Sequence, residues 1–213
     1  MPSLTFYFAP GACSLASHIA LEEAGAPFEP KPISLRKGQQ MTPEYLALNP
    51  KGKVPMLVVD GLPLTENPAI ITYLASLYPD AQLLPAGNSV QALQGLSLIS
   101  FCAAGIHPVL SRFFGPQRFC DLPDATPNVI ALATAANAKN FAIIDKMLEG
   151  KEYMLGSFSA VDGYLLVFWR WCQHLKIDTT AFKNYAALAE RVSARPAVQR
   201  ALAREAEAQA ALA

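Results

Sequence analysis

The hydrophobic pattern of this 213-residue chain changes near Tyr78, and that change limits the fold to two unlike parts. Before Tyr78, short aromatic or β-branched runs alternate with stretches of helical spacing, whereas beyond residue 90 only helical spacing recurs. Proline and glycine gather between residues 79 and 89, as is typical of a linker. We therefore expect a first domain at 1–80, a linker at 81–89 and an all-helical domain at 90–213.

The first part has the order β-α-β-α-β-β-α. Two β-α-β-type connections followed by a hairpin predict a small mixed sheet covered by helices, which is the order of a thioredoxin-like domain. Pro30 and Pro32 favour an edge position for the second strand. The fold class is thus α/β followed by all-α, with strands expected at 4–8, 28–35, 55–59 and 62–65 and helices at 13–24, 43–46 and 69–77.

The second part contains five helical patterns separated by polar or proline-containing segments. Ser159 and Asp162 have the spacing of a capping box before an apolar run. The Ala-, Glu- and Arg-rich tail beyond Arg204 is expected to fray. The predicted helices are 91–110, 128–148, 161–175, 185–194 and 197–210.

Charge and cysteine content narrow the function. Lys plus Arg and Asp plus Glu are both 17, so no electrostatic footprint for nucleic acid or an anionic membrane exists. No apolar run was expected to approach the roughly 20 residues of a membrane helix, and the start of the chain lacks the pattern of a secretory signal. The four cysteines show no C-x-x-C motif and no zinc-ligand spacing, which favours free thiols in a cytoplasm and no metal site.

Cys13 lies where the first strand gives way to a helix, directly after Pro10 and Gly11. Backbone N–H groups at a helix start favour negative charge, so the pKa of this thiol is expected to be lowered. The alternative is a buried structural cysteine. Because no second cysteine is near it in the sequence, a disulfide cycle would need a thiol co-substrate.

Two further segments are candidate binding elements, one at the start of a strand and one at the start of a helix. A cis Val54–Pro55 bond would offer the Val54 backbone to a peptide ligand, although an ordinary trans proline at a strand start is far commoner on sequence alone. Glu66, at the next helix start, would receive an α-ammonium group, and the helix N–H groups would receive the neighbouring carboxylate. The structural alternative is that Asn67 simply caps the helix before Pro68.

His107 comes late in the long predicted helix and directly before Pro108. A proline kink there would turn His107 toward a cleft, whereas an isolated helical histidine is otherwise a packing or surface residue. Ser100 lies two turns earlier on nearly the same face.

Five motifs in register resemble bacterial glutathione transferases of the beta class over essentially the whole chain. They are Ala9–Leu15, Asn49–Pro55, Leu64–Ile70, Phe158–Asp162 and Arg195–Val198. The chain departs from the family pattern at Phe8 (tyrosine in the family), Asn67 (glycine or serine), Ser100 (asparagine) and Pro108 (lysine).

The resemblance implies a glutathione site in the first domain and a hydrophobic co-substrate site between the domains. It implies catalytic roles for Cys13 and His107, and a homodimer. The glutathione-binding residues that it implies are Ala12, Cys13, Lys37, Lys53, Val54, Pro55, Glu66, Asn67, Ser100 and His107.

The expected function is a cytoplasmic glutathione transferase that activates the glutathione thiol for detoxification. Conjugation to a hydrophobic electrophile and thiol–disulfide exchange through Cys13 both remain open. One alternative is a glutathione-dependent cis–trans isomerase of small unsaturated diacids, with Arg112 and Arg118 as the nearby cations. Another is a family member that binds glutathione without turnover.

Overall fold

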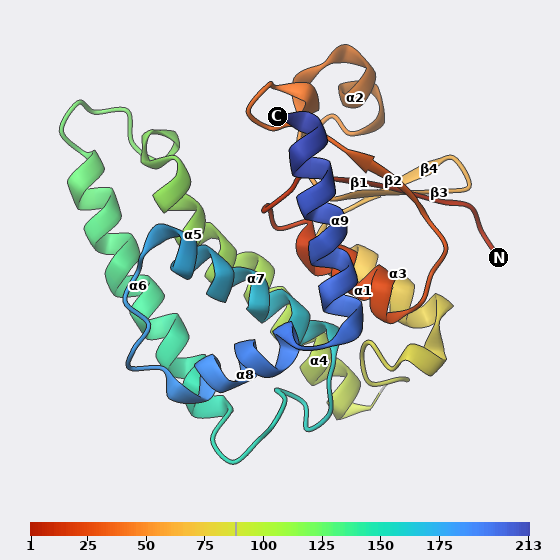
Figure 1. Ribbon diagram of the computed structural model, residues 1–213. Helices are drawn as coiled ribbons and strands as arrows, with labels where there is room; N and C mark the ends of the chain where they lie inside the picture. The colour runs from red at the N-terminus through yellow and green to blue at the C-terminus, as the bar shows by residue number, and fades with distance from the viewer. Residues whose placement is uncertain (88) are drawn as a thin grey trace.

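The computed structural model describes residues 1–87 and 89–213, so Asn88 of the predicted linker lies outside the described residues. The chain forms a sheet with flanking helices and, beside it, a group of helices (Figure 1). The sheet part contains β1 (Leu4–Phe8), α1 (Leu15–Glu23), β2 (Glu29–Pro32), α2 (Pro43–Leu48), β3 (Met56–Val59), β4 (Leu62–Thr65) and α3 (Asn67–Leu77). The helical part contains α4 (Val90–Phe101), α5 (His107–Phe114), α6 (Thr126–Met147), α7 (Ala160–Leu175), α8 (Lys183–Ser193) and α9 (Pro196–Leu212).

The described strands form one sheet in the order β2-β1-β3-β4. β1 pairs parallel with β2 and antiparallel with β3, and β4 returns from β3 as a hairpin. Asp60 and Gly61 both have positive φ, which suits the tight turn that their sequence predicts. The predicted thioredoxin-like order and helical second part are confirmed. β2 is shorter than expected, covering four residues on the edge where its prolines are tolerated.

Alternation along β1 separates the two faces of the sheet. Leu4, Phe6 and Phe8 point into the main core with α1 and α3. The opposite face packs against Tyr45 of α2, in a smaller cluster with Met56. The sheet is therefore covered on both faces. The end of β1, which leads into α1, lies beside the start of β3.

The predicted single helix at 91–110 is wrong. α4 ends at Phe101, a π-helical turn follows at Cys102–Ile106, and α5 begins at His107. Pro108 has no N–H to donate to the carbonyl of residue 104, and its ring crowds that carbonyl, so the regular ladder is interrupted. Asn140 of α6 donates to the Gly105 carbonyl at 3.2 Å, which satisfies one acceptor in this widened turn.

The expected capping box at the start of α7 is present. The N–H and hydroxyl of Ser159 donate to Asp162 Oδ2, and the N–H of Met154 donates to Asp162 Oδ1 at 2.8 Å. Burial raises the pKa of the Asp162 carboxyl to about 6, against the opposing effect of these bonds. α7 itself is buried along most of its length and packs against α1.

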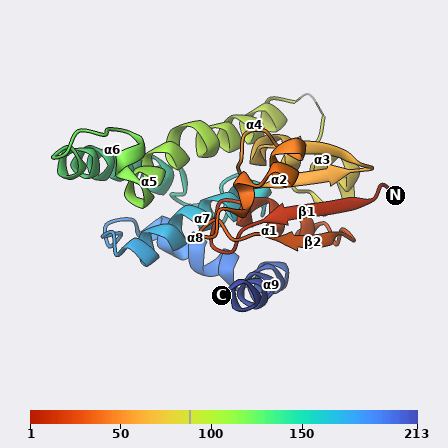
Figure 2. The same cartoon turned by 90° about the horizontal axis from the view of Figure 1, so that it is seen from above.

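The expectation that the tail frays beyond Arg204 is also wrong. α9 continues to Leu212 and runs beside α1 in both views of the molecule (Figure 1, Figure 2). Glu205 and Ala208 are buried in this contact. Arg200 and Arg204 pair with Glu22 of α1, and these ion pairs help to hold α9 in place.

The stretch Val90–Phe114 is long and apolar enough to cross a membrane by length and composition alone, contrary to the sequence expectation. A third of its most apolar window is buried in the fold, where it packs against α3, α6 and α7. The π-helical turn divides it, and its outward face carries Val90, Leu93 and Leu96.

Candidate active site

The turn between β1 and α1 holds Cys13 just before the helix begins. Ser14 Oγ accepts from the N–H of Ala9 at 3.1 Å and donates to its carbonyl, so this side chain closes the turn on itself. Gly11 has φ +75, a conformation that glycine adopts without strain. Cys13 is buried, with 9% of its surface exposed, and Ala12 beside it is partly exposed.

The Cys13 thiol donates to the carbonyl of Val54 at 3.4 Å. The Val54–Pro55 bond is cis, as the sequence analysis considered, and Pro55 is buried behind Val54. The expected lowering of the thiol pKa is wrong for this structure, because burial raises it to about 12. Glu66 and Glu205 add to this effect and Lys53 opposes it. Cys13 is therefore a neutral hydrogen-bond donor here, not a thiolate.

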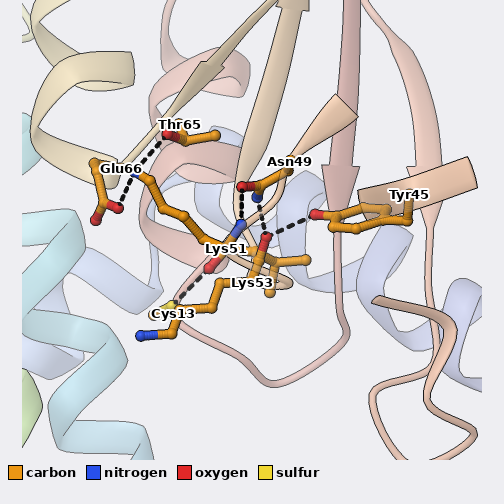
Figure 3. Close-up of polar contacts among 8 residues, drawn as sticks. Cys13, Tyr45, Asn49, Lys51, Lys53, Thr65 and Glu66 are labelled. Carbon is orange, nitrogen blue, oxygen red and sulfur yellow. Dashed lines mark hydrogen bonds and ion pairs between the residues drawn. The ribbon is translucent and has the colours of Figure 1, made fainter. Parts of the chain in front are cut away.

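Two side chains of the sheet part fix the loop that presents Val54. Tyr45 Oη and Asn49 Nδ2 both donate to the Lys53 carbonyl, at 2.6 and 2.7 Å (Figure 3). The backbone N–H of Lys51 donates to Asn49 Oδ1, which closes the loop further. The sequence analysis assigned no role to Tyr45 or Asn49. The Asn49–Pro50 pair within a motif was the available signal for this loop.

Glu66 lies at the mouth of the site, with its side chain 62% exposed. Lys51 Nζ contacts Glu66 Oε1 at 2.7 Å and Thr65 Oγ1 at 2.8 Å (Figure 3). The backbone of Glu66 has φ +77, an uncommon value for a residue with a side chain. Such strain is found at sites where the position of a side chain matters. The Lys51–Glu66 ion pair therefore presents a positive and a negative charge side by side near the start of α3.

The alternative that Asn67 caps α3 is wrong. Glu66 takes the cap position, and Asn67 is the first helical residue, with a buried side chain. Its Nδ2 donates to the Cys13 carbonyl at 3.0 Å, and its Oδ1 accepts from Ser17 Oγ at 2.6 Å. The amide also reaches Tyr164 Oη of α7 at 3.4 Å. The Asn67 side chain thus supports the Cys13 turn from inside the protein.

His107 comes from the helical part and faces the same region. Its ring lies 5.2 Å from the Trp171 ring and 6.3 Å from that of Phe168, measured between centroids. Burial, and next the Lys53 cation, lower the His107 pKa, while Glu66 opposes them. The charges of Lys53 and Glu66 thus affect the pKa of both His107 and Cys13.

Two predicted residues lie apart from this group. Ser100 is exposed on α4, where its hydroxyl donates to the Leu96 carbonyl. Lys37 is exposed, and its Nζ donates to the Ala213 carbonyl at 3.4 Å. A hollow of about 410 Å³ lies between the β1–α1 turn and the C-terminal end of α9. Its lining includes Pro10, Leu35, Arg36 and Leu212.

Comparison with known proteins shows the family to which the chain belongs. Residues 2–76 match the model of the glutathione S-transferase N-terminal domain. Over 205 residues the chain is 34% identical to glutathione S-transferase GstA of Escherichia coli O157:H7, covering 95% of this chain and 98% of that one.

Solved structures extend the likeness to the whole fold. A sphingomonad glutathione S-transferase complexed with glutathione is 36% identical with a TM-score of 0.85, covering 95% of this chain and 98% of its own. A bacterial beta class glutathione S-transferase of Sphingomonas chungbukensis is 36% identical with a TM-score of 0.84, covering 94% and 98%. The chain belongs to the glutathione S-transferase family.

Proposed function

We propose that this protein is a glutathione transferase of the beta class that binds glutathione between the Val54 loop, Glu66 and His107. The observation that carries the proposal is the Cys13 thiol, which donates to the Val54 carbonyl inside a site that also contains an open carboxylate. The Val54 backbone offers an edge to which an extended peptide binds by main-chain hydrogen bonds. The cysteinyl unit of glutathione would then lie against Val54 with its sulfur near Cys13.

The γ-glutamyl end of glutathione is a zwitterion, and the mouth of the site carries matching charges. Glu66 would accept the α-ammonium group, while Lys51 and the N–H groups at the start of α3 would favour the α-carboxylate. Ala12, Lys53 and Pro55 are proposed for the same binding region on the resemblance to the family, and Asn67 supports the site from within. Lys37 and Ser100 remain proposed binding residues at the margins of the site.

Neutral donors around the sulfur favour conjugation as the main reaction. The Cys13 thiol and a neutral His107 would each donate a hydrogen bond to the glutathione thiolate and so stabilise it for attack on an electrophilic carbon. Phe114 is 46% exposed and packs on the buried Trp171, so its ring would offer an apolar surface to a hydrophobic second substrate. Arg112 lies over the Phe119 ring at 5.3 Å, and this contact occupies one of the cations that diacid isomerisation would need.

Thiol–disulfide exchange is the second reaction that this site supports. The Cys13 thiolate would attack the glutathione sulfur of a substrate mixed disulfide, R–S–S–glutathione, which breaks the S–S bond, releases the RS⁻ thiolate and forms a Cys13–glutathione disulfide. A free glutathione thiolate would then attack the glutathione sulfur of that disulfide, which releases the Cys13 thiolate and yields glutathione disulfide. The net result is reduction of the substrate to R–SH by one free glutathione, with glutathione disulfide as the oxidised product.

Turnover of the Cys13→Ala variant tests this assignment. We expect saturable glutathione binding to the wild type by calorimetry and conjugation of a chlorinated nitroaromatic electrophile. Cys13→Ala should lose disulfide exchange and keep measurable conjugation, because His107 still donates to the thiolate. Absence of glutathione binding to the wild type, or full disulfide exchange by the variant, would contradict the proposal.

We also propose a cytoplasmic homodimer with a role in detoxification. The apolar residues Leu62, Val90, Leu93 and Leu96 are exposed on β4 and α4, and a dimer interface would cover such residues. Sedimentation of the wild type and of Leu93→Asp at micromolar concentration tests the dimer. Monomeric wild-type protein would contradict it.

A further inference from the structure

Both backbone polar groups of Gly11 are bound by side chains of the helical part. The Gly11 N–H donates to Glu205 Oε2 of α9 at 2.9 Å. Trp171 Nε1 of α7 donates to the Gly11 carbonyl at 2.9 Å. Gly11 is two residues before Cys13, so these contacts hold the turn that carries the thiol from two helices far along the chain.

Glu205 is an unusual residue for its position. It is 5% exposed, on the face of α9 that otherwise buries Ala201 and Ala208. An ionised carboxylate is costly to bury unless it is paired and hydrogen-bonded, and an apolar residue would pack against α1 without that cost. Its bond to Gly11 is the one hydrogen bond that the described residues give this carboxylate.

The second oxygen of Glu205 faces a buried histidine. Glu205 Oε1 lies 3.5 Å from His18 Nδ1, and His18 is fully buried beside the rings of Phe6 and Phe8. Within residues 1–87 and 89–213, neither His18 ring nitrogen has a hydrogen-bond partner, and neither does Glu205 Oε1. The nearby charges on α1 and α9 are Glu22, Arg200 and Arg204, which pair with one another.

We propose that Glu205, together with Trp171, is a positioning residue for Cys13: through Gly11 it fixes the turn that aims the thiol at Val54, and its negative charge opposes ionisation of that thiol. This inference rests on the proposed role of Cys13 in the site. The negative charge of Glu205 acts on Cys13 across a buried region, where charges interact more strongly than in water. It therefore adds to the larger effect of burial in opposing ionisation of the Cys13 thiol.

Two substitutions at Glu205 separate its charge from its hydrogen bond. Glu205→Gln keeps an oxygen that accepts from Gly11 and removes the charge, whereas Glu205→Ala removes both. Glu207→Gln, at an exposed position on the same helix, is the matched control. The readout is alkylation of Cys13 by iodoacetamide, followed as a function of pH by peptide mass spectrometry.

We expect the alkylation profile of Glu205→Gln to move to lower pH, with a rate at about pH 8 above that of the wild type, because loss of a nearby negative charge favours the thiolate. Glu207→Gln should match the wild type. A Glu205→Gln profile that coincides with that of Glu207→Gln would overturn the proposal.

Trp171→Phe keeps the aromatic packing and removes only the bond to the Gly11 carbonyl, so it provides a second test if the Glu205 variants do not fold. Alkylation of Cys13 should accelerate in this variant, and an unchanged rate would count against a role of the Gly11 contacts in positioning the thiol. These rates are measured without glutathione. A wild type that fails to bind glutathione would therefore overturn the proposed function and leave the alkylation result intact.

Discussion

At the residue scale, the Lys53 carbonyl shows how a binding edge is held by groups that never touch the ligand. Tyr45 Oη and Asn49 Nδ2 both donate to it, so the segment that ends at Val54 has little freedom. Such preorganisation lowers the cost of ordering the loop when a ligand binds. The effect of losing one donor should therefore appear in binding more than in chemistry.

We predict that Tyr45→Phe raises the KM for glutathione about fivefold with kcat unchanged, because one hydrogen bond is worth about 1 kcal/mol and Asn49 still holds the carbonyl. Steady-state kinetics with varied glutathione measures this. Tyr7→Phe is the matched control, since the Tyr7 ring of β1 packs on the Tyr45 ring of α2 with centroids 5.8 Å apart. A fall in kcat at constant KM would show that Tyr45 acts on the chemistry instead.

At the element scale, α7 depends on its first turn, because Asp162 accepts from Met154 N–H and from both Ser159 donors. We predict that Asp162→Ala lowers the free energy of unfolding by about 2–4 kcal/mol, since three buried donors lose their acceptor. Burial raises the pKa of the Asp162 carboxyl, which shows that burying its charge is costly. Removing this carboxyl therefore offsets part of the loss. Urea unfolding measures this, with the exposed Asp178→Asn as control. A change below that of the control would contradict the prediction.

The elements also show what a sequence alone can reveal. Alternation and turn residues were sufficient for β1 and for the β3–β4 hairpin, because these signals are local. Pro108 predicted a kink in the long helix but not that the helix would widen at Cys102–Ile106, a turn to which Asn140 of α6 donates a hydrogen bond. Glu205 was read as part of a polar tail, and only packing on α1 reveals it as buried. Likewise, the positive φ that makes Glu66 the cap in place of Asn67 has no sequence signal.

At the scale of the whole molecule, the sheet part and the helical part share one core. A continuous cluster of buried residues runs from Phe6 of β1 through Ile19 of α1 to Tyr164 of α7. Polar contacts cross the same boundary at Gly11, at Asn67 and between Arg195 and Glu23. Domains joined by small polar interfaces commonly move and unfold separately, whereas a shared apolar core opposes this.

We therefore predict a single cooperative unfolding transition. Both tryptophans, Trp169 and Trp171, lie in α7, so their fluorescence reports the helical part, while hydrogen exchange of β1 and β3 amides reports the sheet. The free energies of opening from the two probes should agree in low denaturant, because the sheet cannot keep α1 packed once α7 and α9 leave it. If β1 and β3 exchange with a much smaller free energy than α7 unfolds, the sheet opens on its own. In that case the contacts at Gly11 would connect two independent domains, and the thiol turn would be exposed whenever the sheet opens.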